Sequence, residues 1–161
     1  MQTIVRNAEA RDVPRIESIW NQIIADTTAT FTTQAKDLDG WLAQKSAAGE
    51  PVLACDRGGE CVGFATYGPF RGGPGYLHIA EHTLMLGPDA RGTGGGRALL
   101  NGLIDIARVQ GKSALIGGIS GENEAALKFH SAMGFAEVGR VPNAGRKFGR
   151  QMDLVLMHRA L

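Results

Sequence analysis

Residues 81–97 read Glu-His-Thr-Leu-Met-Leu-Gly-Pro-Asp-Ala-Arg-Gly-Thr-Gly-Gly-Gly-Arg, and we expect the rest of the chain to be organised around this stretch. Residues 84–86 form an apolar run that is typical of a buried strand, and the Gly-Pro-Asp that follows is typical of a turn. From residue 98 onward, apolar residues recur at helical spacing. The stretch therefore predicts a strand, a turn, a glycine-rich loop and a helix whose N-terminus lies at residues 91–96.

The glycine-rich loop is suited to binding an anion such as a phosphate or pyrophosphate. A helix N-terminus presents backbone N–H groups that have no partner within the helix, together with the positive end of the helix dipole. Glycines at positions 92, 94, 95 and 96 would let an anion approach the backbone closely. An ordinary flexible loop is the alternative. Neither the Walker pattern nor the dinucleotide pattern fits, because Arg97 stands where the first requires lysine and the second its third glycine.

The pattern that remains is Arg-x-x-Gly-x-Gly, at Arg91, Gly94 and Gly96. It resembles the acetyl-CoA pyrophosphate motif of the GNAT superfamily of N-acetyltransferases. The sequences at residues 81–83 (Glu-His-Thr), 129–135 (Phe-His-Ser-Ala-Met-Gly-Phe) and 147–150 (Lys-Phe-Gly-Arg) resemble the phosphinothricin or methionine sulfoximine acetyltransferase branch. The similarity covers nearly the whole chain. It implies an α/β GNAT fold, with a mixed, mostly antiparallel sheet of about six to seven strands flanked by about four helices.

The same resemblance implies where acetyl-CoA is bound: by the end of the strand, by the glycine loop and by an asparagine further along the chain. The residues so implied are Leu84, Met85, Leu86, Arg91, Gly92, Thr93, Gly94, Gly95, Gly96, Arg97 and Asn123. Whether Arg91 and Arg97 touch phosphate or solvent is left open by the sequence.

Composition fits one compact soluble domain over residues 1–161, since 43% of the residues are hydrophobic and 20% are charged. The formal net charge of +1 argues against a nucleic-acid partner and against a polybasic membrane patch. No apolar run approaches the roughly 20 residues of a membrane span, and the start of the chain lacks a signal-peptide pattern, so a cytoplasmic location is expected. No cluster of cysteines and histidines suggests a metal site.

The hydrophobic pattern predicts the element order β-α-α-β-β-β-α-β-α-β-β without an internal repeat. Strands are expected at residues 3–7, 52–56, 61–67, 76–86, 113–119, 135–141 and 152–158, and helices after Asp12, at 38–48, after the glycine loop and at 122–133.

Two cysteines flank Arg57-Gly58-Gly59-Glu60, which is typical of a two-residue hairpin turn centred on the glycines. In that register Cys55 faces Val62 and Cys61 faces Asp56. The thiols should then lie on opposite sides of the sheet, and buried free thiols are favoured over a disulfide.

Glu81 is the candidate general base. Strand alternation places it on one face with apolar neighbours, where a carboxylate must pair, titrate upward or face a wet pocket. A raised pKa would suit a base that deprotonates an ammonium substrate. A salt-bridged glutamate without a catalytic role is the alternative. The resemblance favours catalysis, because the branch carries its proposed base at this position.

His130 is the candidate general acid. Asn123 and His130 are seven residues apart and would lie nearly on one helix face, about 10 Å apart along the axis, so both could contact an extended cofactor. The resemblance implies that Asn123 touches the pantetheine arm and that His130 replaces a tyrosine that protonates the departing thiolate. A packed, hydrogen-bonded histidine is the alternative for His130. His82 is either a supporting partner of the site or a core residue.

The acceptor pocket is predicted less clearly. The resemblance places Phe31 at the acceptor, and the alternative is that Phe31 is a buried core residue. The other candidates for binding the acceptor are Phe70, Arg71, Tyr76 and Lys147, with Arg150 as a further cation. The chain departs from the branch at Leu77, Arg146 and Gln151, where relatives commonly carry arginine, tyrosine and tryptophan. Leucine cannot replace the arginine's charge-assisted bonds to a carboxylate, which makes Arg71 the main candidate for that role.

Together these features predict an enzyme that transfers acetyl from acetyl-CoA to the primary amine of a small amino acid or analogue, of the phosphinothricin or methionine sulfoximine type. Direct attack in a ternary complex requires no acylated residue and no metal, so neither cysteine is needed. A GNAT enzyme that acts on a peptide or protein N-terminus, and a non-catalytic acyl-CoA-binding module, are the alternatives. The family commonly forms homodimers, so a homodimer is expected from the resemblance alone.

Overall fold

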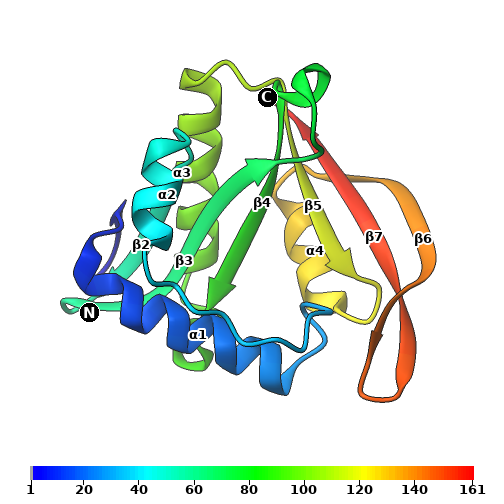
Figure 1. Cartoon of the computed structure of the whole chain (residues 1–161), viewed down its shortest axis with the longest axis horizontal. Helices are drawn as coiled ribbons and strands as arrows, with labels where there is room; N and C mark the ends of the chain where they lie inside the picture. Colours follow the sequence, from blue (N-terminus) through cyan, green and yellow to red (C-terminus); the bar gives the residue numbers. More distant parts are fainter. Residues whose placement is uncertain (1) are drawn as a thin grey trace.

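The computed structural model of the protein describes residues 2–161, and seven strands in it form one sheet in the order β1-β2-β3-β4-β5-β7-β6 (Figure 1). β4 and β5 are parallel, and the other neighbours are antiparallel. The strands are β1 (Thr3–Asn7), β2 (Val52–Arg57), β3 (Glu60–Pro69), β4 (Ile79–Leu86), β5 (Ala114–Ser120), β6 (Ala136–Lys147) and β7 (Arg150–Ala160).

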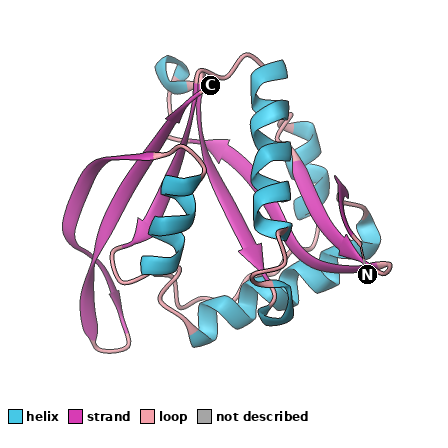
Figure 2. Ribbon diagram, turned by 180° about the vertical axis from the view of Figure 1, so that it is seen from behind, coloured by secondary structure: helices cyan, strands magenta, loops and turns pink. Residues whose placement is uncertain are grey.

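Four α-helices cover the two faces of the sheet. The helices α1 (Val13–Asp26) and α2 (Trp41–Ala47) lie on one face, and α3 (Gly95–Val109) and α4 (Glu124–Ala132) lie on the other (Figures 1 and 2). The expected order of elements and the mixed, mostly antiparallel sheet are confirmed. Among residues 2–161, no helix is both long enough and apolar enough to cross a membrane.

Each face of the sheet has its own apolar core. One buried cluster joins the sheet to α3 and contains Leu99, Leu103 and Leu115. The other joins it to α1 and contains Ile16, Ile19 and Phe64. Removal of this apolar surface from water supplies the main stabilisation, because each fully buried Leu or Phe side chain contributes about 1.5–3 kcal/mol. The two cores therefore hold the sheet in place from both faces.

The centre of the sheet opens because β4 and β5 pair only briefly. Their register comprises Ile79↔Ala114, Ala80↔Leu115 and Glu81↔Ile116. Beyond Glu81 the two strands diverge, as Figure 1 shows. The edge of β4 that faces β5 is therefore without a paired strand from His82 onward, which leaves its backbone polar groups to be satisfied by another partner.

Several expected boundaries were wrong for local reasons. The central strand begins at Ile79 and not at residue 76, because residues 74–76 form a 3₁₀ turn. The second helix begins at Trp41 and not at residue 38, because Gly40 adopts the left-handed conformation with φ of 70°. In α4, Asn123 is the N-cap and not a helical residue, since its side chain accepts from the Ala126 N–H.

The hairpin between β2 and β3 has the predicted two-residue turn, with Gly58 and Gly59 both at positive φ. A β-bulge between Cys55 and Asp56 shifts the register, so Cys55 faces Gly63 and not Val62 as expected, whereas Cys61 does face Asp56. Both thiols are free and buried, and they belong to the separate cores on the two faces. Burial raises the pKa of both cysteines, which keeps them protonated at neutral pH.

The start of α1 is held by an ion network instead of the expected aspartate cap. The Asp12 carboxylate accepts from the Glu9 backbone N–H, and Arg6 donates to it at 2.7 and 3.0 Å. Arg6 also pairs with Asp56 at 2.8 Å, so one guanidinium joins β1, β2 and the start of α1. The guanidinium beside them holds the pKa of both carboxyl groups below the ordinary range.

Candidate active site

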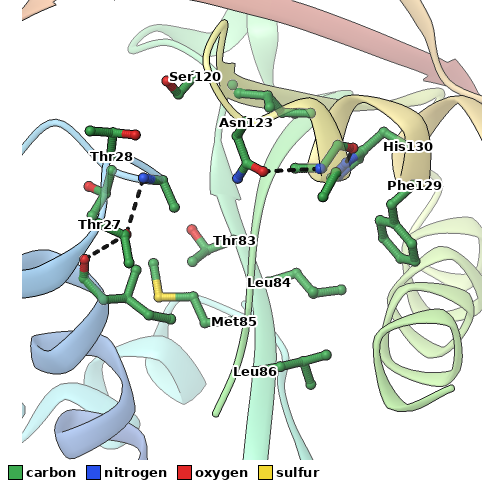
Figure 3. Close-up of a pocket in the computed structure, with 18 of the residues that line it drawn as sticks. Thr27, Thr28, Thr83, Leu84, Met85, Leu86, Ser120, Asn123, Phe129 and His130 are labelled. Atoms are coloured by element: carbon green, nitrogen blue, oxygen red, sulfur yellow. Dashed lines mark hydrogen bonds between the residues drawn. The ribbon is translucent and has the colours of Figure 1, made fainter. Parts of the chain in front are cut away.

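A cavity of about 750 Å³ lies where β4 and β5 separate. In Figure 3 it is bordered by Thr27 and Thr28 on one side, by Asn123 and His130 on the other, and by β4 between them. Its volume is within the range of small-molecule sites. The lining residues are Trp20, Ile23, 27–32, Lys36, 81–86, Arg91, Gly92, Gly96, 117–120, Glu122, Asn123, Ala125, Ala126, Phe129, His130 and Leu154.

Glu81 lies at the last position of β4 that pairs with β5, directly where the cavity opens. None of the ion pairs found among residues 2–161 involves it, so the salt-bridged alternative is excluded for this part of the chain. Desolvation raises the pKa of its carboxyl group, as expected for a half-buried acid without a cation. A Cβ added at Gly118 would lie 3.0 Å from Glu81 Oε1, so this glycine makes room for the carboxylate.

His130 lies on the other side of the strand, because neighbouring residues of β4 point to opposite faces and His130 packs against His82 and not against Glu81. The Nε2 atoms of His82 and His130 are 2.9 Å apart, and His130 Nδ1 is 2.7 Å from the Ala126 carbonyl oxygen. Burial lowers the pKa of both imidazoles, and the neighbouring His130 ring lowers that of His82 as well. Both are therefore neutral at physiological pH.

The glycine loop ends in a helix start without a side-chain cap. Gly92 and Gly94 have φ of 73° and 87°, and the backbone N–H groups at the start of α3 have no capping side chain. This geometry suits an anion. Gly95 serves packing instead of anion approach, since a Cβ there would lie 2.9 Å from Cys55 Sγ. A Cβ at Gly96 would meet Leu86 Cδ1 at 3.4 Å.

The structure brings many of the expected acetyl-CoA residues to one cavity. Those that line it are Leu84, Met85, Leu86, Arg91, Gly92, Gly96 and Asn123, whereas Thr93, Gly94, Gly95 and Arg97 lie outside its lining. Asn123 does so from the cap position, where its Oδ1 is already bonded to the Ala126 N–H at 3.1 Å.

The acceptor residues are assembled less well. Phe31 lines the cavity, but Phe70, Arg71 and Tyr76 do not. Arg71 and Tyr76 are exposed on the loop between β3 and β4, where the Arg71 guanidinium lies 5.9 Å from the centre of the Tyr76 ring. β4 begins only at Ile79, so Tyr76 belongs to this loop and not to the central strand as expected.

Lys147 was expected to contact an acidic acceptor, and the structure places it elsewhere. Its side chain is 3% exposed, and its Nζ donates to the Thr27 and Thr30 carbonyl oxygens at 2.6 and 2.9 Å. Desolvation lowers its pKa. Arg150 is also engaged, in a two-pronged ion pair with Glu122 at 2.8 and 2.9 Å. Lys147 thus fastens the segment 27–30, which lines the cavity, to the β6–β7 hairpin.

Apart from Phe31, sequence reasoning missed the segment 27–32, and it also missed the pair Gly117-Gly118. The adjacent glycines were a usable signal, because glycine inside a buried strand often marks close approach of other atoms. A Cβ at Gly117 would lie 3.0 Å from His82 Cε1, so the two glycines make room on opposite faces of β5. Among residues 2–161, no group of three or more His, Cys, Asp or Glu side chains is arranged to hold a metal ion.

Residues 16–135 match the model of the acetyltransferase (GNAT) family. The chain belongs to this family. It is 37% identical over 156 residues to the L-amino acid N-acyltransferase MnaT of Escherichia coli, covering 95% of this chain and 91% of the relative. It is 36% identical over 161 residues to an L-methionine sulfoximine/L-methionine sulfone acetyltransferase of Pseudomonas aeruginosa, covering 98% and 94%.

Solved GNAT structures have the same fold. A phosphinothricin acetyltransferase from Sinorhizobium meliloti, in complex with acetyl-CoA, superposes with a TM-score of 0.93 at 29% identity, covering 100% of this chain and 89% of that one. A ribosomal-protein-alanine N-acetyltransferase from Brucella melitensis gives a TM-score of 0.94 at 38% identity, covering 98% and 99%. The chain is thus an acetyl-CoA-dependent N-acetyltransferase of the GNAT family.

Proposed function

We propose that this enzyme acetylates the primary amine of a small amino acid or amino-acid analogue, of the methionine sulfoximine, methionine sulfone or phosphinothricin type. One observation carries the proposal. An unpaired carboxylate, Glu81, stands at the point where β4 and β5 part, in the same cavity as the glycine loop at the start of α3. The acceptor classes named for its relatives support the choice of a small amino acid.

Acetyl-CoA supplies the acetyl group as a reactive thioester, and the residues of the cavity fit it. The uncapped N–H groups at the start of α3 would hold its pyrophosphate, with Arg91 as an additional cation. The unpaired edge of β4, residues 84–86, would bond the pantetheine arm and stabilise the charge that develops on the carbonyl oxygen. Asn123 would use its amide N–H₂, since its Oδ1 is already occupied.

Glu81 would take a proton from the substrate ammonium, directly or through a water, and so release the nucleophilic amine. Its raised pKa fits this task, since a base is most effective when its pKa lies near the working pH. His130 would return to the CoA thiolate a proton that its Nε2 first takes up from solvent, because the neutral ring carries its one hydrogen on Nδ1, bonded to the Ala126 carbonyl. In the resting structure Nε2 faces His82, which would hold the ring in place until that proton arrives.

The acceptor would lie between Glu81 and the segment 27–32, with Phe31 against its side chain. Lys36 and Arg91 are the two Lys or Arg side chains of the lining. Arg71 stays a prediction as the partner of the acceptor carboxylate, and this role would require the loop between β3 and β4 to fold over the cavity.

The direct test is release of the CoA thiol from acetyl-CoA with a panel of amines: methionine sulfoximine, methionine sulfone, phosphinothricin, free amino acids and a short peptide that begins with alanine. We expect saturable release with the first three. If none of the small amines supports release while acetyl-CoA binding is demonstrated, the proposed acceptor is wrong. Replacing Arg71 by Gln should raise the KM of acceptors that carry a carboxylate and leave the KM of acetyl-CoA unchanged.

A second candidate is acetylation of a protein N-terminus. It is supported by the similarity to a structure named for ribosomal-protein alanine and by the absence of Arg71 from the cavity lining. A preference for the alanine peptide over every small amine would favour this candidate.

Two further properties belong to the proposal. The exposed apolar side chains Val138, Val141 and Phe148 of the β6–β7 hairpin support a homodimer, which sedimentation of the purified protein would test. The two free buried thiols support a reducing compartment such as the cytoplasm.

A further inference from the structure

His82 and His130 form a buried pair beside the cavity. They come from β4 and α4, and their exposed fractions are 8% and 7%. Both line the cavity, and their rings stack with centroids 5.1 Å apart. Phe135 packs against both rings. His82 was expected to be either a supporting partner of the site or a core residue. The positions of the hydrogens on the two rings decide between these roles.

The proton positions follow from the acceptors. The Ala126 carbonyl can only accept, so His130 Nδ1, 2.7 Å away, must carry a hydrogen. In a neutral imidazole, Nε2 then holds a lone pair. The 2.9 Å contact between the two Nε2 atoms needs one hydrogen, which must therefore sit on His82. His82 Nε2–H thus donates to His130 Nε2.

The other nitrogen of His82 agrees with this assignment. With Nε2 protonated, a neutral His82 has a lone pair on Nδ1 and no hydrogen to place there. His82 Nδ1 is the one fully buried side-chain nitrogen or oxygen of residues 2–161 that has no hydrogen-bond partner. The Ile116 backbone favours the charged form of His82, but His82 Nδ1 has no hydrogen-bond partner. An orphaned N–H at this atom would be costly.

We propose that His82 is a positioning residue of the acetyltransferase: its Nε2–H donates to His130 Nε2 and holds the ring in place, in the tautomer whose Nδ1–H bonds the Ala126 carbonyl. His82 supplies a fixed donor and does not relay protons. A relay would need Nδ1 to take up a proton, and this atom faces no donor. The Ala126 carbonyl sets the tautomer of His130, and His82 holds its other nitrogen, so loss of His82 removes one of the two hydrogen bonds that fix the ring.

The first test uses nuclear magnetic resonance of the full chain labelled with ¹⁵N in its histidines, where long-range ¹H–¹⁵N spectra distinguish the two tautomers. The chain has four histidines, so replacing each in turn assigns the signals. At neutral pH we expect His130 with hydrogen on Nδ1 and His82 with hydrogen on Nε2. His82→Phe should leave the hydrogen on His130 Nδ1 but shift the ¹⁵N resonance of Nε2, which loses its donor. A hydrogen on His130 Nε2 in the unaltered protein, or a spectrum of His130 that ignores His82→Phe, overturns the proposal.

The second test is kinetic and rests on the proposed function. His82→Phe keeps the ring packing but lacks the donor, and should lower kcat by about tenfold, the rate equivalent of one neutral hydrogen bond, with the KM of acetyl-CoA little changed. His82→Gln offers an amide N–H and should restore most of kcat. His158→Gln is the matched control outside the cavity. A Gln variant as slow as the Phe variant would mean a proton relay and would overturn the positioning role.

The two tests fail separately. If the tautomers are as assigned and no amine is acetylated, the proposed function fails and the pair stands. If amines are acetylated and His82→Phe has normal kcat, the positioning role fails and the function stands. Thermal unfolding of each variant shows whether it folds, and the spectrum of His82→Gln gives a result even if the Phe variant does not fold.

Discussion

Replacing Gly145 by Ala should disturb the acceptor side of the site through Phe31. Gly145 is a buried residue of β6, and a Cβ there would lie 2.5 Å from Phe31 Cε2, with Cγ and Cδ2 closer still. Carbon atoms that are not bonded rest about 3.5–4.0 Å apart, so the ring would have to move by about 1 Å or more. We expect the Ala variant to lose about 1–2 kcal/mol of unfolding free energy, within the range for overpacking.

The catalytic effect should fall on the amine and not on acetyl-CoA. Because Phe31 lines the cavity, its displacement should lower kcat/KM for the amine by about tenfold, since a 1 Å misplacement can cost up to about 100-fold. The dissociation constant of acetyl-CoA should change by less than about twofold, because its proposed contacts come from other segments. Steady-state kinetics and calorimetric titration measure the two quantities. Gly139→Ala is the matched control in the same strand, where the new Cβ would meet only Leu156 Cδ1, at 4.0 Å.

A double-mutant cycle decides whether the clash with Phe31 is the cause. Phe31→Ala removes the ring, so the extra methyl group of Gly145→Ala should then fit without further cost. The double variant should match Phe31→Ala to within about 0.5 kcal/mol in both stability and log kcat/KM. Additive effects of the two substitutions would refute the reasoning, because they would mean that Gly145 acts through a contact other than Phe31.

Three further substitutions test other parts of the account. Lys147→Met should lower the free energy of unfolding, measured with denaturant, by about 2 kcal/mol and should raise the KM of the amine, because two carbonyls of the segment 27–30 lose a charged donor. An unchanged KM would show that Lys147 does not position this segment for the amine. Arg6→Met should cost about 3–5 kcal/mol, because Asp12 is left buried and unpaired. In the unaltered protein the stability contributed by the Asp12–Arg6 pair is present above the ordinary carboxyl pKa and is lost as the pH falls below it, because folding lowers the Asp12 pKa. An Arg6→Met variant whose stability falls in acid as much as that of the unaltered protein would contradict this. Glu81→Gln should be more stable than the unaltered protein at neutral pH, and the difference should vanish in acid. Folding raises the pKa of Glu81, so the stability that its carboxyl group contributes is lost as the pH rises. Equal unfolding temperatures of the two proteins at neutral pH would argue against a buried charge on Glu81.

The parts of the fold that could be predicted from sequence are those encoded locally. The alternation and turn chemistry of residues 81–97 predicted a strand, a glycine loop and a helix, and the structure has all three in that order. The paired glycines at 58 and 59 likewise predicted their turn. The predicted pairing register between β2 and β3 was wrong at Cys55, because a bulge depends on how the hairpin packs and not on the turn residues alone.

The site residues that escaped prediction depend on contacts between distant segments. Lys147 was interpreted as a ligand because the family resemblance places its charged segment near the acceptor, but its ammonium is buried against carbonyls 117 and 120 residues away in the chain. His82 and His130 are separated by 48 residues, so their contact follows only once β4 and α4 are packed together. The exposed turn at residues 74–76 interrupts an apparent strand and keeps Tyr76 outside the cavity.

The measurement that tests the central claim most directly is the turnover of Glu81→Gln with saturating acetyl-CoA and the best amine of the panel. Glutamine has nearly the same shape but cannot accept the proton, so kcat should fall by about 100-fold or more while acetyl-CoA still binds with its original affinity. In the unaltered enzyme, kcat/KM should rise with pH through the raised pKa of Glu81, and the Gln variant should lack this rise. A Gln variant that turns over within about threefold of the unaltered enzyme would contradict the assignment of Glu81 as the base.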